Sequence, residues 1–186
     1  MEHRGGKGSS PKTGDGAGVL IQLPHEFFVE ECKRLGFELP AAGNYGVGMV
    51  FFPRDKKVMN ACREVLRKNI KELGLELLGY RVVPVDHSVP GPGAAEVAPT
   101  IEQVFVKAKD ETLVNGAFER KLFVLRNLTS HTIANDVKGS NKEFYITSFS
   151  ARTIIYKGQL RTEQLRAYFD DLQDPRLKTA LALVHS

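Results

Sequence analysis

The 186-residue sequence contains no tryptophan and only two cysteines, Cys32 and Cys62. The two are far apart in the sequence, and neither belongs to a CxxC motif or has histidines nearby. This arrangement does not match the ligand spacing of a zinc site. Both cysteines occupy apolar positions of predicted helices, which favours two buried thiols in a protein from a reducing compartment.

The sequence also lacks a strong charge bias and a long apolar run. Lys and Arg number 26 against 22 for Asp and Glu, and the resulting excess of +4 is spread along the chain. A nucleic-acid-binding protein more often gathers its cations on one element, so we expect no nucleic-acid partner. The longest uncharged apolar stretch, residues 45–53, is too short to span a bilayer, and residues 1–18 do not resemble a signal peptide. We expect no membrane association and a cytoplasmic location.

Several patterns that carry chemistry are missing as well. The five histidines do not form an i, i+4 pair around an acid, and no G-x-S-x-G motif is present, so neither a metalloprotease helix nor a nucleophile elbow is predicted. The glycines Gly14, Gly16 and Gly18 precede a strand, whereas a dinucleotide-binding fingerprint follows one. They predict a tight turn that leads into the strand. No metal site is predicted.

The sequence does contain a regular succession of β-prone and helical segments. Hydrophobic periodicity predicts strands at 17–23, 45–52, 75–85, 101–108, 144–150 and 153–156, and helices at 24–35, 55–73, 116–136 and 162–172. Prolines and glycines predict a surface loop at 87–99. The apolar run at 180–185 is expected to be a core strand. The tight turn near residue 151 favours antiparallel pairing, so the expected fold class is α+β.

Three expectations concern side chains. Asp55 is expected to cap the helix that follows it, and Thr162 to cap the helix at 162–172. The alternating charges between Arg161 and Lys178, among them Asp171, are expected to form a solvated face. Core positions are expected for six aromatic residues, Phe51, Phe52, Phe105, Phe123, Phe144 and Phe149.

A set of short motifs follows in one order along nearly the whole chain. It begins with HRG at 3–5, TGDGAG at 13–18 and PHEFF at 24–28. It continues with GNYGVGMVFF at 43–52, YRVVPV at 80–85, PTIEQVFV at 99–106, ERKLFVLR at 119–126, FYITSFS at 144–150, TIIYKG at 153–158 and LVHS at 183–186. Each motif alone is weak, but their common order resembles the class-II glutamine amidotransferase domain of the glutamate synthase large subunit.

This resemblance implies a four-layer αββα sandwich of antiparallel sheets, the fold of N-terminal-nucleophile hydrolases. It identifies residues 1–186 as a partial domain, incomplete at both ends. The parent domain hydrolyses glutamine to glutamate and ammonia, and the ammonia serves reductive synthesis of glutamate from 2-oxoglutarate. The family's nucleophile is an N-terminal cysteine upstream of the HRG motif. Because this cysteine is absent from the sequence, no catalytic residue is assigned, and the chain alone is expected to be inactive.

The resemblance also implies where the site lies and what the chain would meet. Arg4 and Gly5 would support the active site, and Thr13, Gly14, Asp15 and Gly16 would form a structural loop beside it. The expected partners are glutamine, the remainder of the large subunit, and further copies of the chain through cut sheet edges. FMN and an iron–sulfur cluster would be bound elsewhere in the parent enzyme, with none in this chain.

Two other functions stay open at this stage. The chain could be a binding or scaffold module that keeps the fold without catalysis, or an unrelated basic α+β domain that binds nucleic acid. The sequence does not determine whether NADPH, NADH or ferredoxin is the electron donor of the parent enzyme. In a plastid-bearing source, the location would be the organelle stroma.

Overall fold

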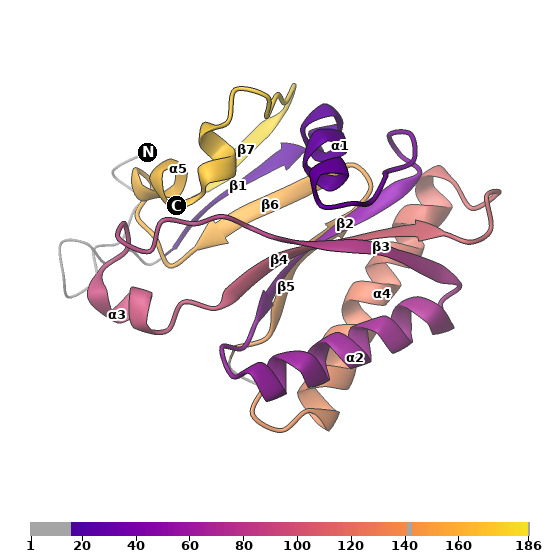
Figure 1. Ribbon diagram of the computed structural model, residues 1–186, viewed down its shortest axis with the longest axis horizontal. Helices are drawn as coiled ribbons and strands as arrows, with labels where there is room; N and C mark the ends of the chain where they lie inside the picture. The colour runs from indigo at the N-terminus through magenta and orange to yellow at the C-terminus, as the bar shows by residue number, and fades with distance from the viewer. Residues whose placement is uncertain (1–15, 141–142, 186) are drawn as a thin grey trace.

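The computed structural model describes residues 16–140 and 143–185. Figure 1 shows two sheets with helices on either side of them. The strands are β1 (Ala17–Gln22), β2 (Tyr45–Phe52), β3 (Leu75–Val82), β4 (Thr100–Ala108), β5 (Tyr145–Ser150), β6 (Thr153–Gly158) and β7 (Ala182–His185). The helices are α1 (His25–Arg34), α2 (Lys56–Glu72), α3 (Pro92–Glu96), α4 (Asn115–Asp136) and α5 (Gln164–Tyr168), with a 3-10 turn, η2, at Asp170–Gln173.

Both sheets are antiparallel throughout. The three-stranded sheet has the order β6-β1-β7 and the four-stranded sheet the order β3-β4-β2-β5. The turn at Ala151 and Arg152 joins β5 to β6 and carries the chain from one sheet to the other. Helices α2 and α4 lie together on one side of the molecule, while α1 and α5 lie beside the three-stranded sheet. The predicted α+β class with antiparallel sheets is confirmed.

Strand β2 contributes side chains to two hydrophobic cores, one on each of its faces. Tyr45, Val47 and Met49 point into a cluster that also contains residues of β1, β6 and α1. Val50 and Phe52 point to the opposite face, where they meet the buried residues of α2 and α4. Because successive side chains of a strand alternate between faces, this fully apolar strand lies at the centre of the fold. Its predicted bounds, 45–52, are confirmed.

Helix α2 begins and ends where its sequence predicts. The Asp55 carboxylate accepts hydrogen bonds from the backbone amides of Lys57 at 2.8 Å and Val58 at 3.0 Å, which satisfies two donors of the first helical turn. Gly74 adopts a φ of 69° just after the helix, a left-handed conformation that glycine accepts readily. Among the described residues, no helix is both long and apolar enough to cross a membrane.

The C-terminal part of the chain differs from the predictions in two respects. The apolar run at 180–185 is not a core strand: within residues 16–140 and 143–185, β7 pairs only with β1, and Leu183 is 66% exposed. The helix predicted at 162–172 is shorter. It spans Gln164–Tyr168, and Thr162 does not cap it, because Glu163 occupies the N-cap position without a side-chain cap hydrogen bond. Asp170–Gln173 forms the separate 3-10 turn.

Two smaller predictions are also wrong. The segment 87–99 is not entirely loop, since it contains helix α3, whose first residue is a proline as helix N-termini allow. Phe123 is 63% exposed on α4 and therefore does not belong to the core, although the other side of the same helix is buried. In both cases a local pattern was compatible with two structures, and the neighbouring elements decided between them.

Candidate active site

Five of the six residues expected at or near the site, Arg4, Gly5, Thr13, Gly14 and Asp15, lie outside the described residues. Gly16, the sixth, immediately precedes β1. Its φ is 141°, a backbone conformation that residues with a Cβ rarely adopt. This backbone conformation favours glycine over other residues at position 16, and it agrees with the tight turn that the sequence predicts.

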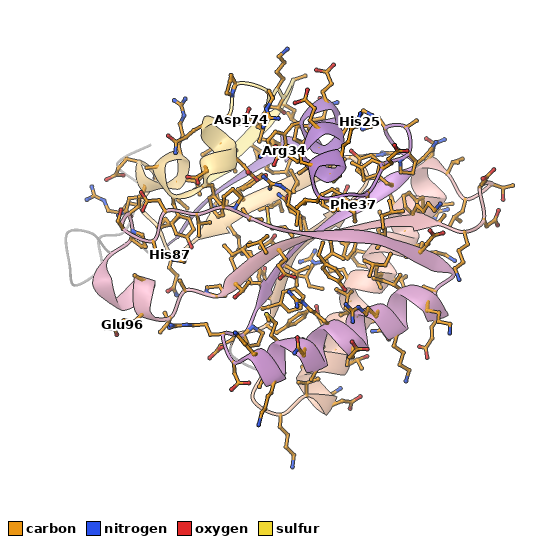
Figure 2. The ribbon with its side chains drawn as sticks, in the orientation of Figure 1. His25, Arg34, Phe37, His87, Glu96 and Asp174 are labelled. Carbon is orange, nitrogen blue, oxygen red and sulfur yellow. The ribbon has the colours of Figure 1, made fainter. Side chains whose placement is uncertain are left out.

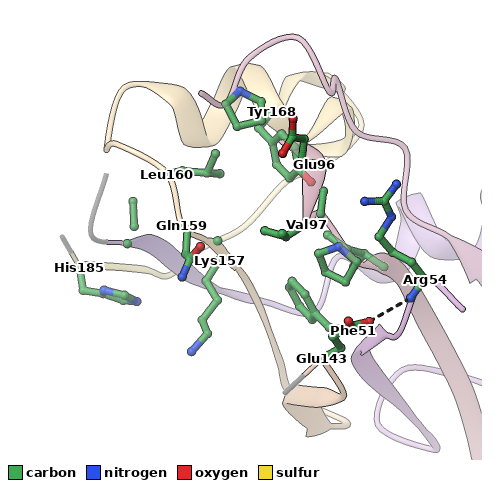
Figure 3. Close-up of a pocket in the computed structure, with 17 residues that line it drawn as sticks. Phe51, Arg54, Glu96, Val97, Glu143, Lys157, Gln159, Leu160, Tyr168 and His185 are labelled. Carbon is green, nitrogen blue, oxygen red and sulfur yellow. Dashed lines mark hydrogen bonds between the residues drawn. The ribbon is translucent and has the colours of Figure 1, made fainter. Parts of the chain in front are cut away.

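Gly16 and Ala17 line a cavity of about 710 Å³ at the end of the space between the two sheets, shown in Figure 3. Its size is within the range of small-molecule sites. The lining residues come from both sheets and from the loop around α3. They include the apolar residues Phe51, Pro90, Val97, Ala98, Pro99, Ile101, Leu160 and Tyr168, and the polar or charged residues Arg54, Glu96, Glu143, Lys157, Gln159 and His185.

Two charged side chains of this cavity, Glu143 and Lys157, contact neighbouring residues. The backbone amide of Arg54 donates a hydrogen bond to the Glu143 carboxylate at 3.3 Å, the dashed line in Figure 3. The Lys157 ammonium lies 4.6 Å from the centre of the Tyr145 ring and donates to the Tyr145 hydroxyl at 3.2 Å. The cavity is therefore lined by apolar residues together with charged residues of both signs.

His185 reaches the cavity because of a glycine on the neighbouring strand. Gly18 of β1 pairs directly with His185 of β7. A Cβ added at Gly18 would lie 2.5 Å from Nε2 of the His185 ring and 2.9 Å from Cβ of Lys157. Such contacts are far below van der Waals distance, so the missing side chain makes room for the imidazole. The third glycine of the TGDGAG loop thus positions a histidine of the LVHS segment.

Neither cysteine is placed to act as a nucleophile. Both side chains are fully buried, as predicted, and neither lines the cavity. Burial raises the pKa of the Cys32 thiol to about 12 and that of Cys62 to about 11. Since the thiolate is the reactive form, both are unreactive near neutral pH. Within residues 16–140 and 143–185, no three His, Cys, Asp or Glu side chains are grouped so that they could hold a metal ion.

A buried polar network lies away from this cavity and was not predicted. The Arg81 guanidinium donates to both carboxylate oxygens of Asp171 at 2.7 and 2.8 Å and to the Gln103 amide oxygen at 2.9 Å. The Tyr156 hydroxyl donates to Asp171 at 2.9 Å. Burial alone would lower the pKa of Arg81, but Asp171 outweighs it and raises that pKa. Asp171 is 2% exposed. The prediction that the charges between Arg161 and Lys178 form a solvated face is therefore wrong for this residue.

Arg176 connects this network to helix α1. Its guanidinium donates to Glu30 at 2.7 Å, to Glu31 at 2.9 Å and to Asp174 at 2.6 Å. Glu31 also accepts from Arg81 at 3.3 Å. Asp174 is labelled beside α1 in Figure 2. The network therefore fixes the segment between α5 and β7 against α1, and through it the course of the chain toward His185.

Lys157 was noted only as part of the TIIYKG motif, and the cavity residues that sequence reasoning missed include Arg54, Glu96 and Glu143. They are distant from one another in sequence and follow no common spacing, so only the pairing of the sheets brings them together. His185 was noted only as part of the LVHS motif. The pairing of Gly18 with His185 links the two motifs in space.

The chain belongs to the family of class-II glutamine amidotransferases, whose model matches residues 1–186. It is 41% identical over 186 residues to the large chain of the NADPH glutamate synthase of Bacillus subtilis (strain 168), covering 100% of this chain and 12% of that protein. It is 38% identical over 185 residues to the chloroplastic ferredoxin-dependent glutamate synthase 2 of Arabidopsis thaliana, covering 100% and 11%. The NADH glutamate synthase of Schizosaccharomyces pombe is 39% identical over 191 residues, covering 100% and 9%.

These relatives confirm the resemblance seen in the motifs. The chain spans about a tenth of the length of the curated relatives that it matches. The region that it shares with them belongs to the amidotransferase family, and most of each relative's length lies outside that region.

Proposed function

We propose that this chain forms part of the glutaminase domain of a glutamate synthase, which releases ammonia from glutamine for reductive synthesis of glutamate from 2-oxoglutarate. The observation that carries the proposal is the cavity between the sheets, where Gly16, the end of the β6 hairpin and His185 meet. These residues belong to three separate motifs of the resemblance. Their convergence on one cavity of ligand size supports a shared site.

In this proposal the described residues supply the wall of the site and not its nucleophile. Amide hydrolysis by this family's chemistry needs a thiol and a free α-amine on one residue, the amine acting as the base. Cys32 and Cys62 are the two cysteines of the sequence, and both are internal and buried. The nucleophile therefore comes from outside these 186 residues, and the chain alone releases no ammonia from glutamine.

The FMN and iron–sulfur cluster of the parent enzyme are likewise assigned to other parts of the polypeptide. An iron–sulfur cluster commonly needs four cysteine thiolates, and two separate buried thiols do not fit it. The names of the relatives include NADPH, NADH and ferredoxin, so they favour no single electron donor. The proposed location is the cytoplasm, or the stroma in a plastid-bearing source.

The proposed partners are glutamine and the remainder of a glutamate synthase large chain. Self-association of the isolated chain through β7 is a further proposal. Its support is the exposure of Leu183 and Val184 on a strand that pairs with β1 on one side, because an unpaired strand edge can accept another strand.

A glutamine-analogue electrophile tests the nucleophile assignment. The complete polypeptide of the native gene and the 186-residue chain are each treated with a diazoketone analogue of glutamine, and the modified residues are located by mass spectrometry. We expect stoichiometric modification of one cysteine outside the 186 residues, together with loss of ammonia release, and no modification of Cys32 or Cys62. Selective labelling of Cys32 would overturn the proposed chemistry. Absence of any labelled cysteine in the complete polypeptide would favour a binding module.

A further inference from the structure

Four buried polar side chains join the two sheets without lining the cavity themselves. They belong to four different elements: Arg81 to β3, Gln103 to β4, Tyr156 to β6 and Asp171 to η2. Arg81 and Gln103 are direct partners across the four-stranded sheet, whereas Tyr156 comes from the three-stranded sheet. Each of the four is at most 6% exposed. This set is called the Asp171 network below.

The Tyr156 hydroxyl connects β6 to this network. It donates to Asp171 at 2.9 Å and accepts from the Gln103 amide nitrogen at 3.0 Å. Burial, followed by the charge of Asp171, raises the pKa of Tyr156 well above its ordinary value, so the hydroxyl keeps the proton that it donates. Among the described residues, no buried polar atom of these four side chains lacks a hydrogen-bond partner. A buried network that is fully satisfied holds its members in one arrangement.

Residues that line the cavity lie next to members of the network along the chain. Residues 157–160 follow Tyr156 directly, and all four line the cavity (Figure 3). Tyr168, which also lines it, comes three residues before Asp171. The hydrogen bond between Tyr156 and Asp171 therefore joins the end of β6 to the segment after α5, and both segments contribute to the cavity lining.

Strand β4 adds a third part of the cavity lining. Ile101 lines the cavity two residues before Gln103, and therefore on the same face of the strand. Burial of apolar side chains holds such segments together but is not directional, whereas a hydrogen bond requires a defined distance and angle. The Asp171 network thus supplies directional contacts that set the three lining segments relative to one another.

We propose that the Asp171 network positions the cavity lining for the binding of glutamine, and that Tyr156 is the positioning residue that acts through residues 157–160. This inference rests on the proposed function, in which the described residues form the wall of the site and do not supply its nucleophile. A wall that binds the substrate and the transition state alike affects KM and leaves kcat unchanged. Loss of the Tyr156 hydroxyl should therefore raise KM for glutamine.

Tyr156→Phe in the complete polypeptide of the native gene tests the proposal, because it removes the hydroxyl and keeps the ring. Thr129→Val is the matched control: Thr129 of α4 is fully buried, accepts from the Asn69 amide nitrogen of α2 at 3.2 Å, and does not line the cavity. Each variant removes one buried hydroxyl that accepts from a side-chain amide, so both should lower overall stability to a similar extent. We expect Tyr156→Phe to raise KM for glutamine by about three- to tenfold with kcat unchanged, and Thr129→Val to change neither.

Hydrogen exchange measured by mass spectrometry gives a second readout that does not depend on turnover. We expect the backbone amides of residues 157–160 and 168–171 to exchange about tenfold faster in Tyr156→Phe than in the natural polypeptide, and at the natural rate in Thr129→Val.

Two results would overturn the proposal. One is a KM that is unchanged in Tyr156→Phe or that changes equally in both variants, and the other is unchanged exchange in the lining segments. If the natural polypeptide releases no ammonia from glutamine, the proposed function fails. Faster exchange confined to Tyr156→Phe would then still support the positioning of the cavity lining, and equal exchange in both variants would refute it.

Discussion

Arg81 is a buried charged residue with a buried counter-ion. It is 6% exposed and is paired with Asp171, which is 2% exposed, while Gln103 and Tyr156 complete the hydrogen bonds. A buried ion pair costs desolvation energy, and its geometry has to be nearly ideal to offset that cost. Removing one partner alone should therefore destabilise the protein more than removing both, because the remaining charge stays buried without its counter-ion.

We expect Asp171→Ala to lower the free energy of unfolding by about 3–5 kcal/mol, because Arg81 would stay buried without its counter-ion. Urea denaturation followed by circular dichroism measures the change. The control is the double substitution Arg81→Met with Asp171→Leu, which removes both charges and should cost less than the single one. A double variant less stable than Asp171→Ala would show that the pair does not act as a unit.

Asp174 should make stability depend on acid pH. Its hydrogen bonds to Arg176 lower the pKa of the carboxyl to about 2 from an ordinary value of 3.8. A carboxyl with a lowered folded-state pKa stabilises the protein above its unfolded pKa, and this stabilisation is lost as pH falls through the folded value. We expect a small stability difference between the natural chain and Asp174→Asn above about pH 4, shrinking toward pH 2.

Urea midpoints at a series of pH values measure this dependence. Glu31 should contribute in the same direction, since Arg176 and Arg81 outweigh the effect of its burial and lower its pKa. A difference between the natural chain and Asp174→Asn that stays constant from pH 6 to pH 2 would contradict the assigned ion pair.

Gly18 tests the geometry at the candidate site. Gly18→Ala places a Cβ 2.5 Å from the His185 ring and 2.9 Å from the Lys157 side chain. We expect the imidazole to move, β7 to loosen from β1, and stability to fall by about 1–3 kcal/mol. Histidine NMR signals and urea denaturation report the two effects. Gly93→Ala is the control, because nothing lies within 4 Å of its added Cβ.

At the scale of the element, α4 shows that adjacent residues can have opposite roles. Leu122 is fully buried and Phe123 is 63% exposed. We expect Leu122→Ala to cost about 2–5 kcal/mol in the isolated chain, whereas Phe123→Ser should stay within about 0.5 kcal/mol. Thermal unfolding of the two variants is the measurement. A large loss in Phe123→Ser would place Phe123 in the core of this domain.

The elements that were predicted correctly are those whose local sequence pattern is compatible with only one type of secondary structure. Strand β2 is apolar on both faces and ends near a proline, and α2 combines the Asp55 cap with an apolar stripe and a terminal glycine. The segment 162–172 has no comparable signal. Its backbone instead follows a course that brings Asp171 against Arg81. These two residues are 90 positions apart, so no local pattern reveals their contact.

At the scale of the whole molecule, β7 is the open edge of the three-stranded sheet in the described structure. We expect the isolated chain to self-associate at micromolar concentration and Leu183→Lys to weaken this association, because edge charges oppose strand pairing. Sedimentation measures both. Val82→Lys is the matched control, since Val82 is 63% exposed on the edge strand of the other sheet. A strictly monomeric natural chain, or equal effects of the two variants, would contradict association through β7.

The sequence by itself determined the fold class, most element positions and the family, because these follow from periodicity, capping residues and the order of motifs such as TGDGAG. It also predicted that both cysteines are buried. Tertiary structure alone decided that Gly18 makes room for His185, that Asp171 is buried against Arg81, and that Phe123 faces outward. These facts depend on which distant segments pack together. Periodicity gives the faces of each element, but only packing decides what each face meets.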